Sequence, residues 1–349
     1  MKTKVCRVDP NQFSDLDVSE AAELIKEGNL VAFPTETVYG LGADALNPSA
    51  CDSVFDAKGR PHDNPLIVHV LSPSDFSKYA YTEKEILLNQ LAEKFMPGPL
   101  TVILPKKKII PDSVTVGLQT VALRCPSHPV ARALIKMSGR PIAAPSANLS
   151  GKPSPTSAFH VIEDMNGRIP MIIDGGPSEV GLESTVISLN GDTIHLLRPG
   201  FVTVNDLKEV TENIVISDAV LSSLKENQKP ESPGMKYRHY APKSPVTMVQ
   251  GREEAVLDFF KTKLKEGFGV LCFEEDLKYL SSCDCDGKLI SFGSKFDLLS
   301  QASSLFDSLR KFDGFSVEHI YCRATSQSDL GLAISNRLLR ACAFSMIEI

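Results

Sequence analysis

The stretch Leu30-Val-Ala-Phe-Pro-Thr-Glu-Thr-Val-Tyr-Gly-Leu-Gly42 shows the pattern that recurs through the first half of the chain, an apolar run followed by a polar turn. Leu30–Phe33 is typical of a buried strand. The hydroxyls, carboxylate and phenol of Pro34–Gly42 predict a loop that binds a ligand, because Gly40 and Gly42 let the backbone approach it closely. A tight strand-to-helix turn that merely requires glycine is the alternative.

Further short apolar runs, most of them bounded by proline or glycine, predict strands at 66–70, 100–104, 121–124, 142–144, 171–173, 185–187 and 194–197. Apolar residues at helical spacing predict helices at 17–26, 87–95 and 130–137. These strands and helices do not alternate strictly. The expected N-terminal fold is therefore α/β, a mixed twisted sheet with flanking helices rather than a doubly wound parallel sheet.

The chain changes character near residue 215. Residues 226–236 are polar and contain prolines, which indicates a linker. The linker ends in Pro233-Gly-Met-Lys-Tyr-Arg-His-Tyr-Ala-Pro242, where aromatic rings and cations are concentrated. This segment predicts a lid over a polar site, with an inert tether as the alternative.

A second pattern of alternating elements begins after Pro245. It predicts strands at 246–249, 270–273 and 319–322 and helices at 253–266, 298–312 and 333–342. Strict alternation favours a small parallel-sheet domain. This domain contains no Gly-x-Gly-x-x-Gly fingerprint, so the sequence does not support nucleotide binding there. The predicted domains are 1–215, a linker at 216–244, and 245–349.

The composition argues against several classes of protein. The formal net charge of −6 argues against affinity that comes mainly from neutralising nucleic-acid phosphates. The N-terminus lacks a signal-peptide pattern and no apolar run reaches membrane-spanning length, so we expect a cytoplasmic chain without a membrane partner. The eight scattered cysteines are expected to be reduced. Cys283-Asp-Cys285 lacks a matching second pair, so a zinc site is not expected.

Polar residues gather where the predicted strands end. Lys58-Gly-Arg60 combines a point-like and a fork-shaped cation that suit phosphate oxygens, although a solvated surface turn is the usual outcome for such a triplet. Ser146 and Asn148 leave a buried strand and must find partners in the backbone or a ligand. Similar junctions at Arg124, 152–155, 174–176, 183–185 and 197–200 predict one site lined from several strands.

Together these segments resemble the threonylcarbamoyl-AMP synthase family in its two-domain form. That form has a YrdC-like catalytic domain, a linker and a Rossmann-like C-terminal domain. The resemblance rests on ordered motifs at 33–42, 58–61, 64–69, 97–101, 144–148, 174–176, 183–185, 197–200 and 233–242. One departure is Met96, where many relatives carry an aromatic residue, which puts the packing around it in doubt.

The resemblance implies that L-threonine, bicarbonate and ATP are joined into threonylcarbamoyl-AMP and pyrophosphate. A downstream transferase complex would then use the product to modify tRNA, so that this chain meets tRNA only indirectly. Mg²⁺ is expected to arrive with ATP, without dedicated protein ligands. By motif, the implied catalytic and phosphate residues are Lys58, Arg60, Ser146 and Asn148. Further nucleotide contacts are implied for Asn64, Thr120, Ser154, Arg198, Tyr237 and His239, and threonine contacts for Thr37, His69, Arg124, Ala144 and Ser184.

The chemistry of these residues is consistent with that assignment. Arg124 can hold a carboxylate as a fork, and Lys58 with Arg60 can neutralise charge on a leaving pyrophosphate. Two other functions stay open at this point. One is an RNA-binding, translation-associated module that uses the same basic cleft, and the other is a domain that acts on carbamoyl phosphate.

Overall fold

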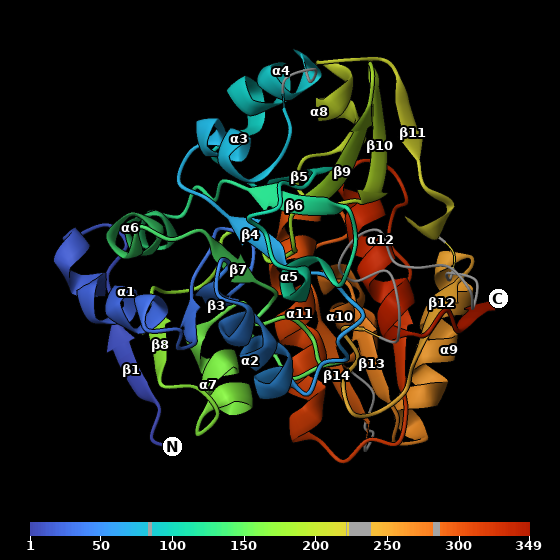
Figure 1. Ribbon diagram of the computed structural model, residues 1–349. Helices are drawn as coiled ribbons and strands as arrows, with labels where there is room; N and C mark the ends of the chain where they lie inside the picture. The colour runs from blue at the N-terminus through green and yellow to red at the C-terminus, as the bar shows by residue number, and fades with distance from the viewer. Residues whose placement is uncertain (83–85, 221, 223–238, 282–286) are drawn as a thin grey trace. The chain divides into compact units, whose positions relative to one another are not determined.

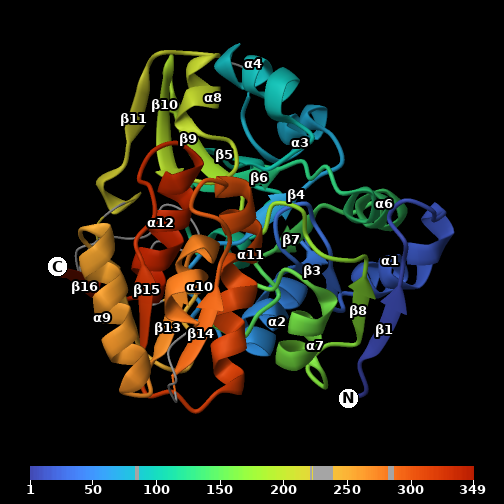
Figure 2. The same ribbon diagram turned by 180° about the vertical axis from the view of Figure 1, so that it is seen from behind.

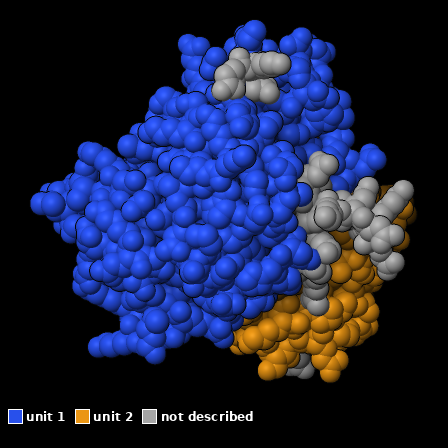
Figure 3. Space-filling view, in the orientation of Figure 1, with its two compact units in different colours: residues 1–150, 154–220, 224–236 blue, residues 151–153, 221–223, 237–349 orange. Residues whose placement is uncertain are grey.

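The computed structural model describes residues 1–82, 86–220, 222, 239–281 and 287–349 (Figure 1). The chain divides into two compact units, which Figure 3 shows in different colours. Unit 1 comprises residues 1–150, 154–220 and 224–236, and unit 2 comprises residues 151–153, 221–223 and 237–349.

Unit 1 is built on an 11-stranded sheet with both parallel and antiparallel neighbours, which confirms the predicted mixed α/β class. In spatial order the strands are β1 (Lys4–Arg7), β8 (Met171–Asp174), β2 (Val31–Phe33), β3 (Gly40–Asp44), β7 (Ile142–Ala144), β4 (Ile67–His69), β6 (Thr120–Arg124), β5 (Leu100–Pro105), β9 (Thr185–Asn190), β10 (Thr193–Arg198) and β11 (Ile214–Ile216).

Strand β3 corrects the interpretation of the opening stretch. Gly40 lies opposite Phe33 in an antiparallel pair, so the stretch forms a hairpin and its glycines lie in a strand instead of a binding loop or a strand-to-helix turn. The reason is packing, because a Cβ on Gly42 would lie 2.8 Å from both the Phe33 ring and Ile142. Glycine here makes room for an aromatic ring on the buried sheet.

Helices cover both faces of this sheet (Figure 1). The helices are α1 (Ser19–Lys26), α2 (Pro48–Lys58), α3 (Phe76–Tyr79), α4 (Ile86–Phe95), α5 (Asp112–Thr115), α6 (Pro129–Ser138), α7 (Ala158–Met165) and α8 (Val204–Lys208), with short 3₁₀ turns at Asp15–Val18, Pro73–Asp75 and Asp218–Val220. Within β2, Val31 and Phe33 join the core formed with α1 and α6, whereas Ala32 joins the core formed with α2, α4 and α7. This alternation buries the sheet on both faces.

Unit 2 is a parallel sheet with helices around it, as the alternation predicted (Figure 2). Its strands in spatial order are β14 (Lys288–Ser291), β13 (Gly269–Cys272), β15 (Ile320–Arg323), β12 (Val246–Gln250) and β16 (Met346–Glu348). The helices are α9 (Glu253–Lys265), α10 (Glu274–Leu280), α11 (Leu298–Lys311) and α12 (Leu330–Ala341), with a 3₁₀ turn at Phe312–Gly314.

Three expectations from the sequence concern membrane spans, the packing of Met96 and the cysteines. Among the described helices, none combines the length and apolarity that crossing a bilayer requires. Met96, although it is not aromatic, packs against the main core of unit 1. The cysteines that the structure describes are free thiols, and the Cys283-Asp-Cys285 pair lies outside the described residues.

Candidate active site

Lys58 is the last residue of α2, and its amine lies on the loop that contains Ser146 and Asn148. Gly59 ends the helix with a φ of 60°, in the left-handed region. Only 3% of Lys58 is exposed; its Nζ donates to the Ser146 carbonyl oxygen and, at 2.5 Å, to that of Asn148. The surface turn that is the usual outcome for a Lys-Gly-Arg triplet is therefore wrong for Lys58.

The loop that receives Lys58 is itself fixed. The Ser146 hydroxyl donates to Asn148 Oδ1 at 2.5 Å. Ser146 also bridges to Gly40, and the Ala147 amide donates to the Tyr39 carbonyl oxygen at 2.8 Å. These bonds bring the hairpin of β2 and β3 against the Ser-Ala-Asn loop, so two distant motifs meet.

Arg60 lies beside the next predicted residue, Asn64. Its Nη2 donates to the carbonyl oxygens of Asn64 and Pro65 at 3.1 and 3.4 Å. Asn64 is 1% exposed, and within the described residues its side-chain oxygen accepts no hydrogen bond. Buried polar atoms normally have partners. This oxygen is therefore suited to accept a hydrogen bond from a ligand.

The strand register separates two ends of the site. Thr120 begins β6 and Arg124 ends it. Arg124 pairs with His69 across the parallel β4, whereas Ile67 pairs with Ala144 of the antiparallel β7. The predicted phosphate residues therefore lie where β4 and β6 begin and β7 ends. The arginine and the histidine lie at the opposite end of the same strands.

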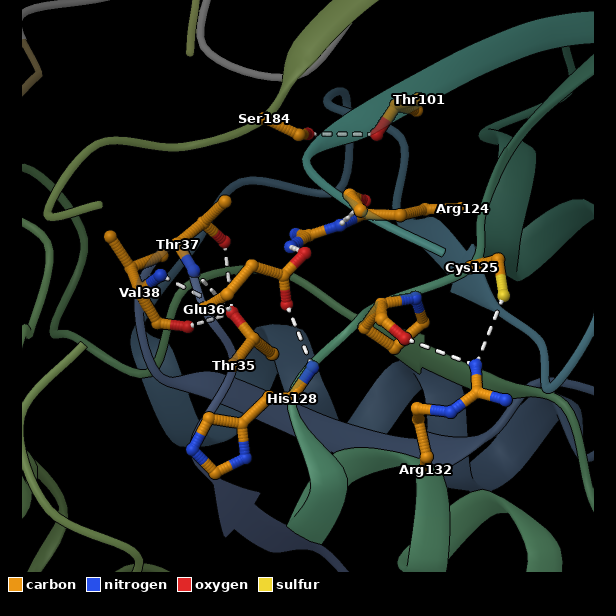
Figure 4. A network of polar contacts seen from close by, with 12 residues as sticks. Thr35, Glu36, Thr37, Val38, Thr101, Arg124, Cys125, His128, Arg132 and Ser184 are labelled. Carbon is orange, nitrogen blue, oxygen red and sulfur yellow. Dashed lines mark hydrogen bonds and ion pairs between the residues drawn. The ribbon is translucent and has the colours of Figure 1, made fainter. Parts of the chain in front are cut away.

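Arg124 is paired with a carboxylate that the sequence did not assign to it (Figure 4). Its Nη2 lies 2.7 Å from Glu36 Oε1, and both side chains are almost fully buried. The His128 backbone amide donates to Glu36 Oε2 at 3.4 Å. Burial favours a higher pKa for Glu36, but the charge and hydrogen bond of Arg124, together with backbone hydrogen bonds, outweigh it, so the pKa falls below its usual value.

His69 is a neutral neighbour of this ion pair. Its Nδ1 lies 3.1 and 3.3 Å from the carbonyl oxygens of Ile67 and Ile142, which can only accept, so Nδ1 carries the proton. Burial, followed by the positive charge of Arg124, lowers the pKa of His69 to about 3. His69 can therefore serve as a neutral wall or hydrogen-bonding group, but not as a cation for a carboxylate.

Ser184 joins the two predicted groups of residues. Its hydroxyl lies 2.7 Å from that of Thr101 (Figure 4). Arg198 Nη2 donates to the same hydroxyl at 3.1 Å. Ser154 bonds the carboxylate of the adjacent Glu183. Two residues predicted to contact the nucleotide, Arg198 and Ser154, thus lie next to the residue predicted to contact threonine.

Thr37 sits in the turn between β2 and β3 and is completely buried. Its hydroxyl lies 2.8 Å from that of Thr35, which also accepts from the Val38 amide at 3.2 Å. Glu36 in the same turn was noted in the sequence only as a carboxylate. The apolar run before Glu36 indicates that this carboxylate is buried. A buried carboxylate needs a cation or several donors, so the sequence could have predicted that Glu36 has such a partner.

The lid prediction falls partly on residues that the structure does not describe. Tyr237 is outside the described residues. His239 belongs to unit 2, where its ring lies 5.7 Å from that of Tyr240, and Tyr240 packs 5.1 Å from Phe306. Closure of this segment over a nucleotide stays a prediction.

Dedicated metal ligands are not apparent in the described part of the chain. There, no group of three or more His, Cys, Asp or Glu side chains is arranged to hold a metal ion. Mg²⁺ accepts one or two protein oxygens when phosphates and water complete its shell. The oxygens next to Lys58, the Ser146 hydroxyl and the Asn148 amide, fit that limited role.

The mixed sheet with its lysine-capped loop defines a catalytic domain of the Sua5–YciO–YrdC type. The family model described as "Telomere recombination" matches residues 23–200, and the model described as "Threonylcarbamoyl-AMP synthase, C-terminal domain" matches residues 202–343. The chain belongs to the threonylcarbamoyl-AMP synthase family in its two-domain form.

Relatives match along nearly the whole chain. The threonylcarbamoyl-AMP synthase of Bacillus subtilis is 44% identical, with 100% of both chains covered. The Pyrococcus abyssi synthase is 45% identical over 94% of this chain and 95% of its own. A crystal structure of P. abyssi Sua5 complexed with L-threonine has a TM-score of 0.91 at 42% identity, covering 99% of this chain and 100% of that one.

Proposed function

We propose that the chain is an L-threonylcarbamoyladenylate synthase, a nucleotidyltransferase that converts L-threonine, bicarbonate and ATP into threonylcarbamoyl-AMP and pyrophosphate. The observation that carries the proposal is the buried Lys58 amine on the fixed Ser146–Asn148 loop, a preorganised cation that would serve a triphosphate. The full-length match to two synthases supports it.

The reaction needs no nucleophile from the protein. The amine of threonine and bicarbonate give a carbamate and water, and a carbamate oxygen then attacks the α-phosphorus of ATP. The bond from the α-phosphorus to the bridging oxygen breaks, and pyrophosphate leaves with its electron pair. Catalysis of such a step depends on positioning and charge stabilisation.

The described residues would divide this work between the two ends of the site. Lys58 and Arg60 would stabilise the charge on the leaving pyrophosphate, with Ser146 and Asn148 orienting the phosphates. Thr120 and Asn64 would contact the rest of the nucleotide from the same end, and Ser154 and Arg198 would contact it from beside Ser184. Mg²⁺, bound mainly through phosphate oxygens and water, would supply further charge neutralisation.

The amino-acid end would hold threonine. Arg124 would bind the carboxylate through Nη1, because its Nη2 already donates to Glu36 and its Nε to the Gly98 carbonyl oxygen. Thr37, His69 and Ser184 would surround the rest of the molecule. Ala144 would approach it from the end of β7, nearer the predicted phosphate residues. Because one methyl group is worth only about 1–3 kcal/mol of discrimination, serine should be a weak alternative substrate.

The product is an activated carbamoyl adenylate, so it must be consumed by a transferase. We place that step in a partner complex acting on tRNA, in the cytoplasm where ATP and tRNA are available. The lid segment would close over the bound nucleotide through Tyr237 and His239. Deleting residues 233–242 should then reduce turnover and weaken ATP binding, and an unchanged enzyme would end the lid proposal.

The deciding experiment is pyrophosphate release from ATP with bicarbonate and each amino acid in turn. Threonine should give the fastest release. Turnover of alanine equal to that of threonine would contradict the placement of the amino-acid site. Release of orthophosphate from carbamoyl phosphate, without any need for ATP or bicarbonate, would favour the carbamoyl-phosphate function. Steeply salt-dependent RNA binding without pyrophosphate release would favour the RNA-binding module.

A further inference from the structure

Unit 2 contains a cavity of about 380 Å³ at the carboxyl ends of β12, β13 and β15. These are neighbouring parallel strands in the order β13, β15, β12. In open α/β sheets, ligands bind outside the carboxyl ends of the strands, and a volume of this size is within the usual range for small-molecule sites. Neither the family models nor the active site of unit 1 assigns a ligand to this cavity.

One fixed cation in the cavity is Arg323, which ends β15 and is 6% exposed. Its Nε lies 3.3 Å from Asp276, and its guanidinium lies 5.5 Å from the centre of the Phe273 ring. Asp276 in turn accepts the Phe273 backbone amide at 3.1 Å. The guanidinium is therefore held in a defined orientation on the cavity wall.

The second cation is Lys295, placed by the loop that follows β14. The backbone amide of Lys295 donates to Glu275 Oε2 at 2.8 Å, and the adjacent Ser294 hydroxyl donates to Oε1 of the same carboxylate. Lys295 is thus positioned by its backbone. The residue lines the cavity, and its ammonium group meets Glu253, which also lines it.

A carboxylate from the protein now contacts both cations. Glu253 Oε2 lies 2.6 Å from Lys295 Nζ, and its Oε1 lies 4.0 Å from Arg323 Nη2. The Glu253 side chain is 54% exposed, unlike Asp276 beneath it. Exposed ion pairs contribute little to stability, so an external anion could displace Glu253 at small cost.

A ligand must displace Glu253 from Lys295 and Arg323, and this requirement favours one kind of anion. A monocarboxylate would only replace one single charge with another. A phosphate monoester carries about two negative charges at neutral pH and three acceptor oxygens for one lysine and one arginine fork. The remaining cavity wall offers Val256 and the Phe273 ring for an organic body, with Gln250 and Gln327 as polar contacts.

We propose that this cavity binds a phosphate monoester of mononucleotide size, with its phosphoryl group on Lys295 and Arg323 in place of Glu253. The site is separate from the nucleotide site proposed for unit 1.

Hydrogen exchange of the full chain with AMP, inorganic phosphate or succinate tests this proposal, because it resolves the two units. AMP should slow exchange at residues 249–256 and 323–327. Equal protection by inorganic phosphate would keep the phosphoryl site but assign it to free phosphate. Equal protection by succinate, or AMP protection confined to unit 1, would overturn the proposal.

Two pairs of variants identify the residues. Lys295→Met should weaken AMP protection in unit 2 by about tenfold, since a charge-assisted bond is lost. Lys265→Met, at the far end of α9, removes the same charge and should change nothing. Glu253→Gln should strengthen binding, whereas the neighbouring Glu254→Gln should not. Equal effects within either pair would show a general charge effect and overturn the site. Arg323 is not substituted, because its removal would leave the buried Asp276 without its ion-pair partner.

Discussion

Two cations of unit 1 are held in different ways. Lys58 donates to carbonyl and amide oxygens of the Ser146–Asn148 loop, whereas Arg124 is paired with the Glu36 carboxylate. The oxygens that accept from the Lys58 ammonium group in these bonds are neutral. A carboxylate fixes the Arg124 guanidinium and offsets part of its charge. We expect the first cation to serve a polyanion such as triphosphate and the second to orient a single carboxylate.

The largest effect on catalysis should follow from Lys58→Ala. Loss of a preorganised charge that stabilises the leaving group should lower kcat by roughly 10²–10³-fold. The KM for threonine should change little, because the amino-acid end is intact. Steady-state pyrophosphate release measures both, with the surface variant Lys26→Ala as the control. A mainly threonine-dependent defect would contradict the division of the site into two ends.

The largest effect on stability should follow from Glu36→Gln. It leaves the buried Arg124 without its counter-ion, at a cost of about 3–5 kcal/mol in the free energy of unfolding. Because the folded-state pKa of Glu36 is lowered, its stabilisation is present above the unfolded pKa near 4.5 and is lost as pH falls through the lower, folded value. Urea unfolding between pH 3 and pH 7 should show this acid loss in the wild type and not in the variant.

His69 gives a second, separate pH window. Its pKa falls from 6.5 to about 3 on folding, so the unfolded chain binds more protons between these values. Stability should therefore rise with pH up to about 6.5. His69→Gln should flatten the wild-type slope between pH 5 and 6.5, where Glu36 contributes little. An unchanged slope would mean that the imidazole is protonated in the folded protein.

The smallest effect should come from Thr101→Val. This change keeps the size of the side chain and removes the hydroxyl that lies 2.7 Å from Ser184 Oγ. One neutral hydrogen bond contributes about 1 kcal/mol, so the KM for threonine should rise about fivefold with kcat nearly constant. Because Arg198 still holds Ser184, a loss as large as that of Lys58→Ala would show that the two ends are not separate.

Local patterns in the sequence were enough to locate most of the strands. Apolar runs such as Ile142–Ala144 mark strands buried on both faces, and strict alternation marked the parallel sheet of unit 2. The edge strand Lys4–Arg7 was missed because it is short, polar and largely exposed. Gly40–Asp44 was missed because its glycines suggest a turn until Phe33 is seen packed against them.

The site was less predictable than the fold, and for a different reason. Lys58 looks like a surface residue because the sequence does not show that a loop 88 residues later will cover its amine. The partners Glu36 and Arg124 are also separated by 88 residues. Such contacts depend on strand order and register, which no single segment encodes. The family resemblance supplied Lys58 and Arg124, but not Glu36, because it compares many motifs at once.

The register of β4, β6 and β7 fixes the distance between the two ends of the proposed site. Thr120 and Arg124 occupy opposite ends of the five-residue strand β6, roughly 13 Å apart. If Thr120 contacts the nucleotide and Arg124 the amino acid, as proposed, the ladder hydrogen bonds of β6 would set the span between the two substrates. A shift of β6 by one residue would turn its side chains to the other face of the sheet. The hydrogen bonds that hold the sheet therefore also keep Thr120 and Arg124 in place.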